Sequence, residues 1–291
     1  MITASMVKDL REQTGAGMMD CKKALTETNG NMDEAINWLR EKGIAKSAKK
    51  ESRIAAEGLA NIYVNGNKAV ILEVNSETDF VSKNKEFIDM IDSIGNALLN
   101  SNAKTLEEAK EVKCGDETIG SLIINKTAKI GEKLSLRRFE IVNKEEDENF
   151  GAYIHMGGKI AALTLIKGGN TDIAKEVAMQ TAAMKPLYAF KEDVPADVLD
   201  NEKNVLKEQA MNEGKPEEIA SKMVIGRLNK FYKEICLNEQ AFIKDGNLSV
   251  SKYLENNKAN LVKMIRYEVG EGMEKRNDDL ASEVMKQIKE N

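Results

Sequence analysis

The chain has 291 residues, of which 42% are hydrophobic and 31% are charged, and its formal net charge is -5. This length accommodates two or more domains, and the composition is typical of a soluble, helix-rich globular protein. The negative balance argues against a chain-wide nucleic-acid-binding field, and no apolar run reaches the roughly 20 residues of a membrane span.

Residues 1–43 predict three short helices that pack as a small bundle. Their boundaries are marked by Thr3, by Thr14-Gly15-Ala16-Gly17, by Asn29-Gly30 and by the capping-box pair Asn31 and Glu34. Because about 40 residues are marginal for independent stability, we expect an appended module that binds another protein. Gly43 opens a basic stretch to Arg53, which we interpret as a solvated helical linker rather than an RNA contact. The first domain is therefore predicted over 1–53.

The first half of a core is predicted over 54–146. Residues 61–64 and 68–74 flank Asn65-Gly66, which is a strong hairpin signal. A polar stretch then joins the second strand to a helix that begins near Glu86. This stretch carries one large apolar residue, Phe80, among turn-forming and helix-capping residues. Phe80 either folds back as a hydrophobic staple, or it is presented beside Asp79 to a partner's pocket.

The order of hairpin, turn and helix then recurs. The first half is completed by three further elements. They are a helix over 106–112, a stretch over 120–127 that begins as a helix, and a strand over 130–142. Residues 151–158 and 159–166 form a second hairpin pattern, Gly168-Gly169 supplies a turn, and 172–184 has helical spacing. We therefore expect a duplicated α+β core with helices packed on antiparallel sheets, whose second half comprises 147–184 and 235–268. In this copy the turn carries no aromatic residue.

Two long helical segments interrupt the second half over 185–234. The first runs from Val194 to Met211 and the second from Pro216 to Glu234, with Gly214 between them. Glycine after one helix and proline at the start of the next indicate a helix hairpin, which we expect to protrude as an antiparallel coiled coil. A strand over 260–267 follows. The remaining 269–291 predict a C-terminal helical module with a helix over 277–288.

Residues that could perform chemistry are few. His155 is the single histidine, so serine–histidine, cysteine–histidine and multi-histidine metal sites cannot form within one chain. No phosphate-binding glycine motif is present. Cys21, Cys114 and Cys236 are scattered and odd in number, which favours free thiols in a reducing compartment. The first ten residues lack a signal-peptide pattern. We expect a cytoplasmic protein without a cofactor, a metal or a catalytic site of its own.

Six motifs along the chain carry a family resemblance. They are Leu10–Leu25 (LREQTGAGMMDCKKAL), Thr78–Val81 (TDFV), Ala128–Glu132 (AKIGE), Asp193–Pro195 (DVP), Gly214–Pro216 (GKP) and Arg266–Gly272 (RYEVGEG). Together they resemble the bacterial translation elongation factor Ts family. Two positions depart from the family pattern: Ser82, where alanine is usual, and Ala241, where proline is common.

The resemblance implies a ubiquitin-associated-like N-terminal bundle and a guanine-nucleotide exchange factor for elongation factor Tu. It implies that the loop of Thr78, Asp79, Phe80 and Val81 enters the GTPase domain of that partner near its magnesium ion. Further partner contacts are expected at Met18, Met19, Ile130, Gly131 and His155. The expected partner is elongation factor Tu, both GDP-bound and nucleotide-free, with no membrane and no direct nucleic-acid contact. Two assemblies are also compatible with the sequence: a homodimer, or a complex of two copies of the chain with two copies of the partner. Either would form through the coiled coil or the core.

Three other interpretations remain without that resemblance. One is an adaptor that binds some other protein through its N-terminal helices. A second is a nucleic-acid binder that uses the basic stretch 46–53, which would show steeply salt-dependent RNA retention. The least favoured is a metal-dependent enzyme, because the chain lacks a recognisable set of ligands.

Overall fold

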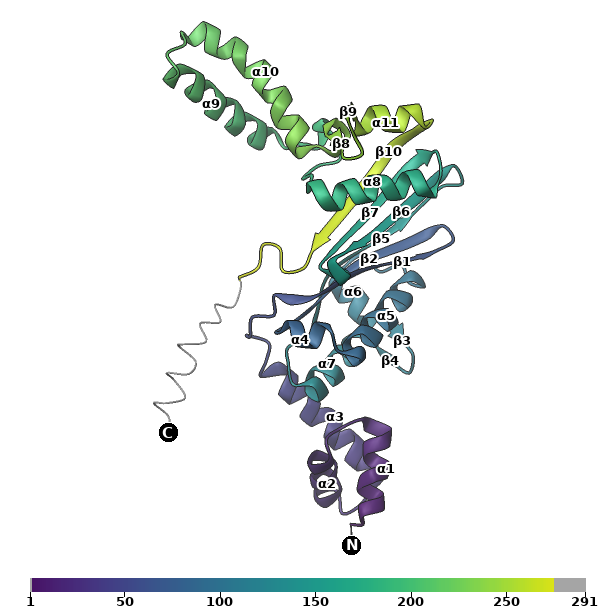
Figure 1. The fold of residues 1–291 in the computed structure, drawn as a ribbon. Coiled ribbons are helices and arrows are strands. Elements are labelled where there is room, and N and C mark those ends of the chain that lie inside the picture. The colour runs from purple at the N-terminus through teal and green to yellow at the C-terminus, as the bar shows by residue number, and fades with distance from the viewer. Residues whose placement is uncertain (1, 275–291) are drawn as a thin grey trace. The chain divides into compact units, whose positions relative to one another are not determined.

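The computed structural model describes residues 2–274, which contain eleven α-helices and several small antiparallel sheets (Figure 1). The fold is therefore a multidomain α+β fold, as predicted. The chain divides into two compact units. The first holds the chain up to Asn61, Leu72–Ile141 and the chain from Glu268 onward; the second holds Ile62–Ile71 and Val142–Tyr267. The helix predicted over 277–288 lies outside the described residues.

The N-terminal bundle consists of α1 (Ala4–Thr14), α2 (Met18–Glu27) and α3 (Met32–Ala48). The Thr3 side chain accepts from the Met6 N–H, and Asn31 Oδ1 accepts from the N–H groups of Asp33 and Glu34. These bonds satisfy donors that a helix start leaves unpaired, so the predicted caps are confirmed. A buried cluster around Leu10 and Leu25 joins the three helices.

The third helix continues past the point where we placed the start of the linker. Gly43 lies inside α3, where it is buried, and an added Cβ there would lie 3.5 Å from the Ala128 side chain. A glycine inside a helix costs about 1 kcal/mol relative to alanine. Packing of α3 against α7 (Ile119–Ile130) offsets that cost, because tertiary contacts supply most helix stability.

The remaining elements of the first half follow β1 (Glu57–Asn65) and β2 (Lys68–Ser76). They are α4 (Asp79–Ser82), α5 (Lys85–Leu99), α6 (Leu106–Glu111), β3 (Lys113–Cys114), β4 (Glu117–Thr118), α7 and β5 (Ser135–Asn143). The sheet order β1-β2-β5 makes β2 the central strand, which explains its nearly continuous burial. The strand predicted to start at Ile130 begins five residues later. Gly131, at φ 91°, terminates α7 instead, and its N–H donates to the Thr127 carbonyl.

A buried carboxylate ties the central strand to the end of the described chain. Glu73 on β2 is fully buried, and it accepts from Arg137 Nη1 at 3.0 Å, from Arg138 Nε at 2.6 Å and from the Gly270 N–H at 2.9 Å. Arg138 also donates to the Glu268 carbonyl at 3.0 Å. Buried charge is tolerated here because several donors surround it.

The second unit contains a sheet of order β10-β7-β6. Its strands are β6 (Glu148–His155), β7 (Ile160–Gly168) and β10 (Ala259–Glu268), and β6 pairs antiparallel with β7 from Glu148↔Lys167 to His155↔Ile160. Helix α8 (Thr171–Met184) packs across β6 and β7 (Figure 1). The Thr164 hydroxyl donates to the Ala174 carbonyl at 2.8 Å, which fixes the helix on the sheet.

Helices α9 (Ala196–Asn212) and α10 (Glu217–Ile235) pack against each other as the predicted helix hairpin (Figure 1). Ala210 and Ala220 are fully buried, and ion pairs Lys207–Glu217 and Arg227–Glu213 link the two helices near the turn. The unit is completed by the short elements β8 (Ala241–Phe242), β9 (Asp245–Ser249) and α11 (Val250–Asn256). No helix in the described part of the chain is long and apolar enough to cross a membrane.

Candidate functional site

The connection from β2 to α5 contains a single helical turn, α4, that displays one aromatic side chain. Phe80 is 81% exposed, which is more than any other large hydrophobic residue described, whereas its neighbour Val81 is buried. The interpretation of Phe80 as a folded-back staple is therefore wrong, and the alternative of a presented side chain agrees with its exposure. Val81 faces the interior of the unit and anchors the turn.

Local hydrogen bonds shape the turn. Thr78 caps α4, and its hydroxyl oxygen accepts weakly from the Val81 N–H at 3.5 Å. The Ser76 hydroxyl donates to the Thr78 carbonyl at 2.9 Å, and the Ser82 hydroxyl donates to the Asp79 carbonyl at 2.7 Å. Short hydroxyl side chains bond to nearby backbone in this way at turns and helix starts. This sequence thus predicts a turn, but its folding into a helical turn was not anticipated.

Glu132, just after α7, binds the turn from outside it. Its Oε2 accepts from the N–H groups of Glu77 at 3.1 Å and of Thr78 at 3.0 Å, and its Oε1 accepts from the Thr78 hydroxyl at 2.6 Å. The Glu77 carboxylate in turn accepts from the Lys133 N–H at 2.6 Å and from Arg53 Nη1 at 3.3 Å. Bonds to ionised acceptors are among the stronger protein hydrogen bonds. The backbone before Phe80 is consequently fixed by two carboxylates.

Asp79 is half-buried at the start of α4. One of its carboxylate oxygens lies 2.7 Å from Lys83 Nζ in an exposed pair four residues apart. A pair of this kind contributes little to stability, but it orients the carboxylate along the helical turn. Asp79 therefore presents a negative charge beside the exposed ring of Phe80.

The other residues expected to touch a partner are spread over the molecule. Met18 and Met19 are exposed at the start of α2, Ile130 is half-buried and Gly131 is exposed at the end of α7. Ile130 and Gly131 immediately precede Glu132, so the structure brings the end of α7 to the Phe80 turn. His155 belongs to the second unit, where it is exposed and stacks on Tyr153 with ring centroids 5.9 Å apart.

A comparison with protein-family models matches residues 77–271 to the family described as Elongation factor TS. The match covers about two thirds of the chain and begins at Glu77, so it includes the whole Phe80 turn and Glu132. The chain belongs to the elongation factor Ts family. It therefore has the role of that family in translation elongation, which is nucleotide exchange on elongation factor Tu. Exchange requires binding to that partner and no chemical step.

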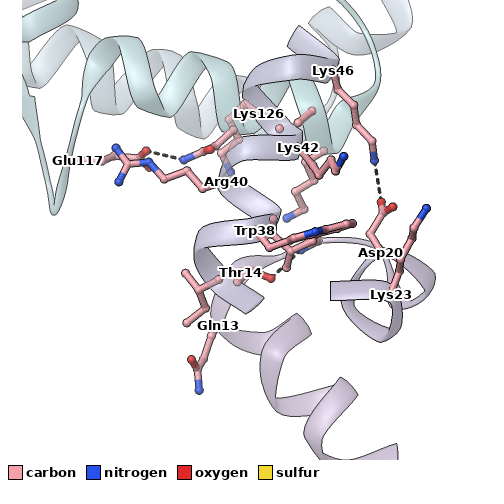
Figure 2. A pocket seen from close by; sticks show the side chains of 18 of the residues that line it. Gln13, Thr14, Asp20, Lys23, Trp38, Arg40, Lys42, Lys46, Glu117 and Lys126 are labelled. Carbon is pink, nitrogen blue, oxygen red and sulfur yellow. Dashed lines mark hydrogen bonds and ion pairs between the residues drawn. The ribbon is translucent and has the colours of Figure 1, made fainter. Parts of the chain in front are cut away.

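A cavity of about 610 Å³ lies between the N-terminal bundle and α7 in this family member (Figure 2). Six of its lining residues are cationic: Lys23, Arg40, Lys42, Lys46, Lys126 and Lys129. Several of these charges already have partners. Lys42 Nζ lies 5.3 Å from the Trp38 ring centroid, Lys46 pairs with Asp20 at 2.9 Å, and Lys126 and Lys129 share Glu86. The cavity is thus lined by cations from the N-terminal bundle and from α7, and four of them contact groups on α2, α3 or α5.

Glu86 links two of these lysines to the segment that follows the Phe80 turn, because it lies in the first turn of α5. Lys126 Nζ and Lys129 Nζ approach its Oε1 at 2.7 and 2.6 Å. Burial raises the pKa of the Glu86 carboxyl, but the hydrogen bonds and charges of the two lysines outweigh burial and hold that pKa below its ordinary value. Glu86 is therefore ionised at neutral pH and fastens α5 to α7.

Nucleophile and metal chemistry find little support in the described residues. Burial raises the pKa of the Cys236 thiol to about 11, so it is protonated at neutral pH, and burial also raises the pKa of Cys21 and Cys114. Within residues 2–274, no three His, Cys, Asp or Glu side chains gather as metal ligands. The arrangement is suited to contact with another protein.

Proposed function

We propose that this member of the elongation factor Ts family promotes GDP release by inserting the Asp79–Phe80 turn near the magnesium site of elongation factor Tu. It then stabilises the nucleotide-free form of the partner. The observation that carries this proposal is the exposure of Phe80 on a turn that is fixed by hydrogen bonds to the carboxylates of Glu77 and Glu132. An exposed apolar side chain on a fixed backbone gains burial on binding without losing internal packing.

The energetics follow from thermodynamic linkage. A factor that binds the nucleotide-free partner more tightly must itself be weakened by nucleotide to the same degree. A nanomolar nucleotide complex corresponds to about 12 kcal/mol, so one contact cannot displace the nucleotide alone. Burial of Phe80 contributes on the order of 1.5–3 kcal/mol. If this contact forms only as GDP leaves, it accelerates release by roughly one to two orders of magnitude.

Asp79 and Phe80 have different parts in this mechanism. The Phe80 ring wedges between elements of the GTPase domain and disturbs the groups that hold Mg²⁺, whose loss leaves phosphate charges unscreened. Asp79 positions the turn or pairs with a basic group of the partner. It does not extract the ion, because a single carboxylate is a weak site for a hard divalent cation. Thr78 and Val81 hold the turn in shape.

Other surfaces supply the remaining binding energy. We propose that Met18, Met19, Ile130 and Gly131 contribute contacts to the GTPase domain, and that His155 contacts a second domain of the partner. In the same proposal the core is an internal duplication, and the α9–α10 hairpin is a coiled coil that offers a dimerisation surface. The factor acts in the cytoplasm, without a cofactor. The basic stretch 46–53 is less suited to RNA, since Lys46 and Arg53 at its two ends pair with Asp20 and Glu77.

The test replaces Phe80 with alanine and measures release of fluorescent GDP from elongation factor Tu by stopped flow. We expect Phe80→Ala to retain the wild-type thermal midpoint, because the side chain is exposed, and to slow factor-stimulated release about ten- to a hundredfold. Ile225→Ala is the matched control, because Ile225 is 69% exposed on α10, which belongs to the other compact unit. Equal release rates for Phe80→Ala and wild type would refute the role of the ring. Absence of stimulated release by the wild-type chain would favour the adaptor interpretation.

A further inference from the structure

The end of α7 holds the Phe80 turn on both of its sides. We propose that Glu132 is a positioning residue for nucleotide exchange, and that together with Lys126 and Lys129 it forms a clamp that keeps Phe80 in its binding orientation before the partner arrives. This inference rests on the proposed function of Phe80. It adds a residue that acts on exchange through the Phe80 turn.

The first half of the clamp is the Glu132 carboxylate. It receives three hydrogen bonds, and all of them come from the two residues that lead into α4: the N–H groups of Glu77 and Thr78 and the Thr78 hydroxyl. The two N–H groups lie where the chain leaves β2, beyond the ladder of the sheet. A single carboxylate therefore satisfies both donors and fixes the direction in which the chain enters the helical turn.

The second half of the clamp acts on the other side of Phe80. Glu86 lies in the first turn of α5, and it is held by Lys126 and Lys129, which are three residues apart and so share one face of α7. The entry and the exit of the turn are thus fastened to one short segment, residues 126–132. Between these points Phe80 is exposed, so the clamp restrains the backbone and leaves the ring accessible.

Restraint of this kind changes a particular part of the kinetics. A free turn would lose conformational freedom when Phe80 enters the partner, whereas a clamped turn has already lost it. Because Phe80 is proposed to act as the nucleotide leaves, a loose turn weakens the state in which release occurs. Loss of the clamp therefore lowers the release rate at saturating factor. The half-saturating concentration changes less, because other surfaces supply most of the binding.

The experiment compares Glu132→Ala with the same substitution at a glutamate of β4, the strand that directly precedes α7. Glu117 is also half-buried, and its carboxylate accepts from Asn125 Nδ2 at 2.7 Å instead of contacting the turn. We expect Glu132→Ala to lower the saturating GDP-release rate about tenfold, which corresponds to about 1.4 kcal/mol. Glu117→Ala should leave this rate unchanged. Glu132→Gln should recover most of it, because the amide oxygen still accepts from the two N–H groups.

Two further variants separate positioning from general stability. Thr78→Val removes the hydroxyl bond to Glu132 and the weak α4 cap, while both N–H bonds to Glu132 are kept, so it should give a smaller loss in the saturating rate. Combining Glu132→Ala with Phe80→Ala should slow release no more than Phe80→Ala alone, since the clamp acts through the ring. Multiplicative losses in the double variant, or losses shared equally by Glu117→Ala, would overturn the positioning role.

The two proposals can fail separately. If Phe80→Ala releases GDP as fast as wild type, the proposed function of the ring fails, whatever Glu132→Ala does. If Phe80→Ala is slow but Glu132→Ala matches Glu117→Ala, the ring acts without the clamp and only the present inference fails. Circular dichroism melts of each variant show whether a slow rate reflects unfolding. In that case Thr78→Val decides, and a wild-type rate for it counts against the clamp.

Discussion

The chain connects a central strand to a helix twice, and the two connections are built in opposite ways. From β7 to α8 it passes through Gly168 and Gly169, both in left-handed conformations with φ 77° and 61°, and Asn170 caps the helix at once. A Cβ at Gly168 would lie 2.3 Å from the Lys258 carbonyl oxygen. This turn is short because its backbone packs directly against a neighbouring segment.

From β2 to α5 the chain instead adds a helical turn and keeps a large side chain outside. Its backbone is held by hydrogen bonds to the carboxylates of Glu77 and Glu132, and the Phe80 side chain that follows stays exposed. The two connections therefore differ in what holds the backbone. The Phe80 turn is held by hydrogen bonds to carboxylates, whereas the Gly168-Gly169 turn is held by close packing against a neighbouring segment. Close packing with glycine favours stability, while external hydrogen bonds leave room for a partner.

The largest expected effect concerns the glycine turn. Gly168→Ala forces a left-handed residue with a Cβ onto the Lys258 carbonyl, so it should lower the free energy of unfolding by roughly 2–4 kcal/mol. Urea unfolding followed by circular dichroism measures this change. Gly214→Ala is the control, because Gly214 has φ 83° but no heavy atom within 4 Å of an added Cβ, and it should cost about 1 kcal/mol. Equal costs for the two variants would show that close approach is unimportant at Gly168.

A smaller effect is expected within the displayed turn. Asp79→Asn removes the charge that pairs with Lys83 and that lies beside Phe80, and because this pair is exposed, stability should change by less than about 0.5 kcal/mol. Release of GDP should slow about two- to threefold through loss of a partner contact or of orientation. Stopped-flow release measures this, with Lys83→Met as the control that removes the ion pair but keeps the Asp79 charge. A hundredfold loss would mean that Asp79 itself acts on the ion.

The third expected effect is a pH dependence at the exit of the turn. The folded-state pKa of Glu86 lies below its ordinary value, so the ionised carboxylate stabilises the fold above the unfolded pKa of about 4.3. This contribution is lost as the pH falls through the lower folded pKa. Glu86→Gln should therefore be about 0.5–1 kcal/mol less stable than wild type at pH 7.

The difference between Glu86→Gln and wild type should shrink in acid, which urea unfolding at pH 7, 5 and 3 can measure. Asp89→Asn serves as a control, because the Asp89–Lys85 pair lies on the same helix but is exposed. A difference that stays constant down to pH 3 would contradict the assigned role of the lysines.

Many elements of this structure could be predicted from local sequence patterns. The caps at Thr3 and Asn31, the hairpins, the helix hairpin and the turn at Phe80 all depend on residues close in sequence, which is where periodicity and capping rules apply. The continuation of α3 through Gly43 depends on packing against α7, so the glycine alone indicated a boundary that tertiary contacts removed.

The hydrogen bonds that hold the Phe80 turn could not be predicted from local sequence patterns. Glu132 lies 54 residues from Thr78, and no periodic signal relates a carboxylate after one helix to two backbone N–H groups after a strand. The sequence placed Glu132 inside a family motif without indicating what it binds. Exposure of Phe80 could be inferred from its polar neighbours, whereas the fixed backbone beneath it required the fold.

The buried Glu73 also has a consequence for the order in which the chain matures. Its carboxylate lies on β2, but one of its donors is the N–H of Gly270, 197 residues later. During synthesis from the N-terminus, β2 and the arginines of β5 leave the ribosome long before that segment exists. The set of donors around this charge is therefore complete only after the second unit has been translated, and such distant pairings form slowly. Until then, Arg137 and Arg138 of β5 are the charged donors that can offset the buried carboxylate.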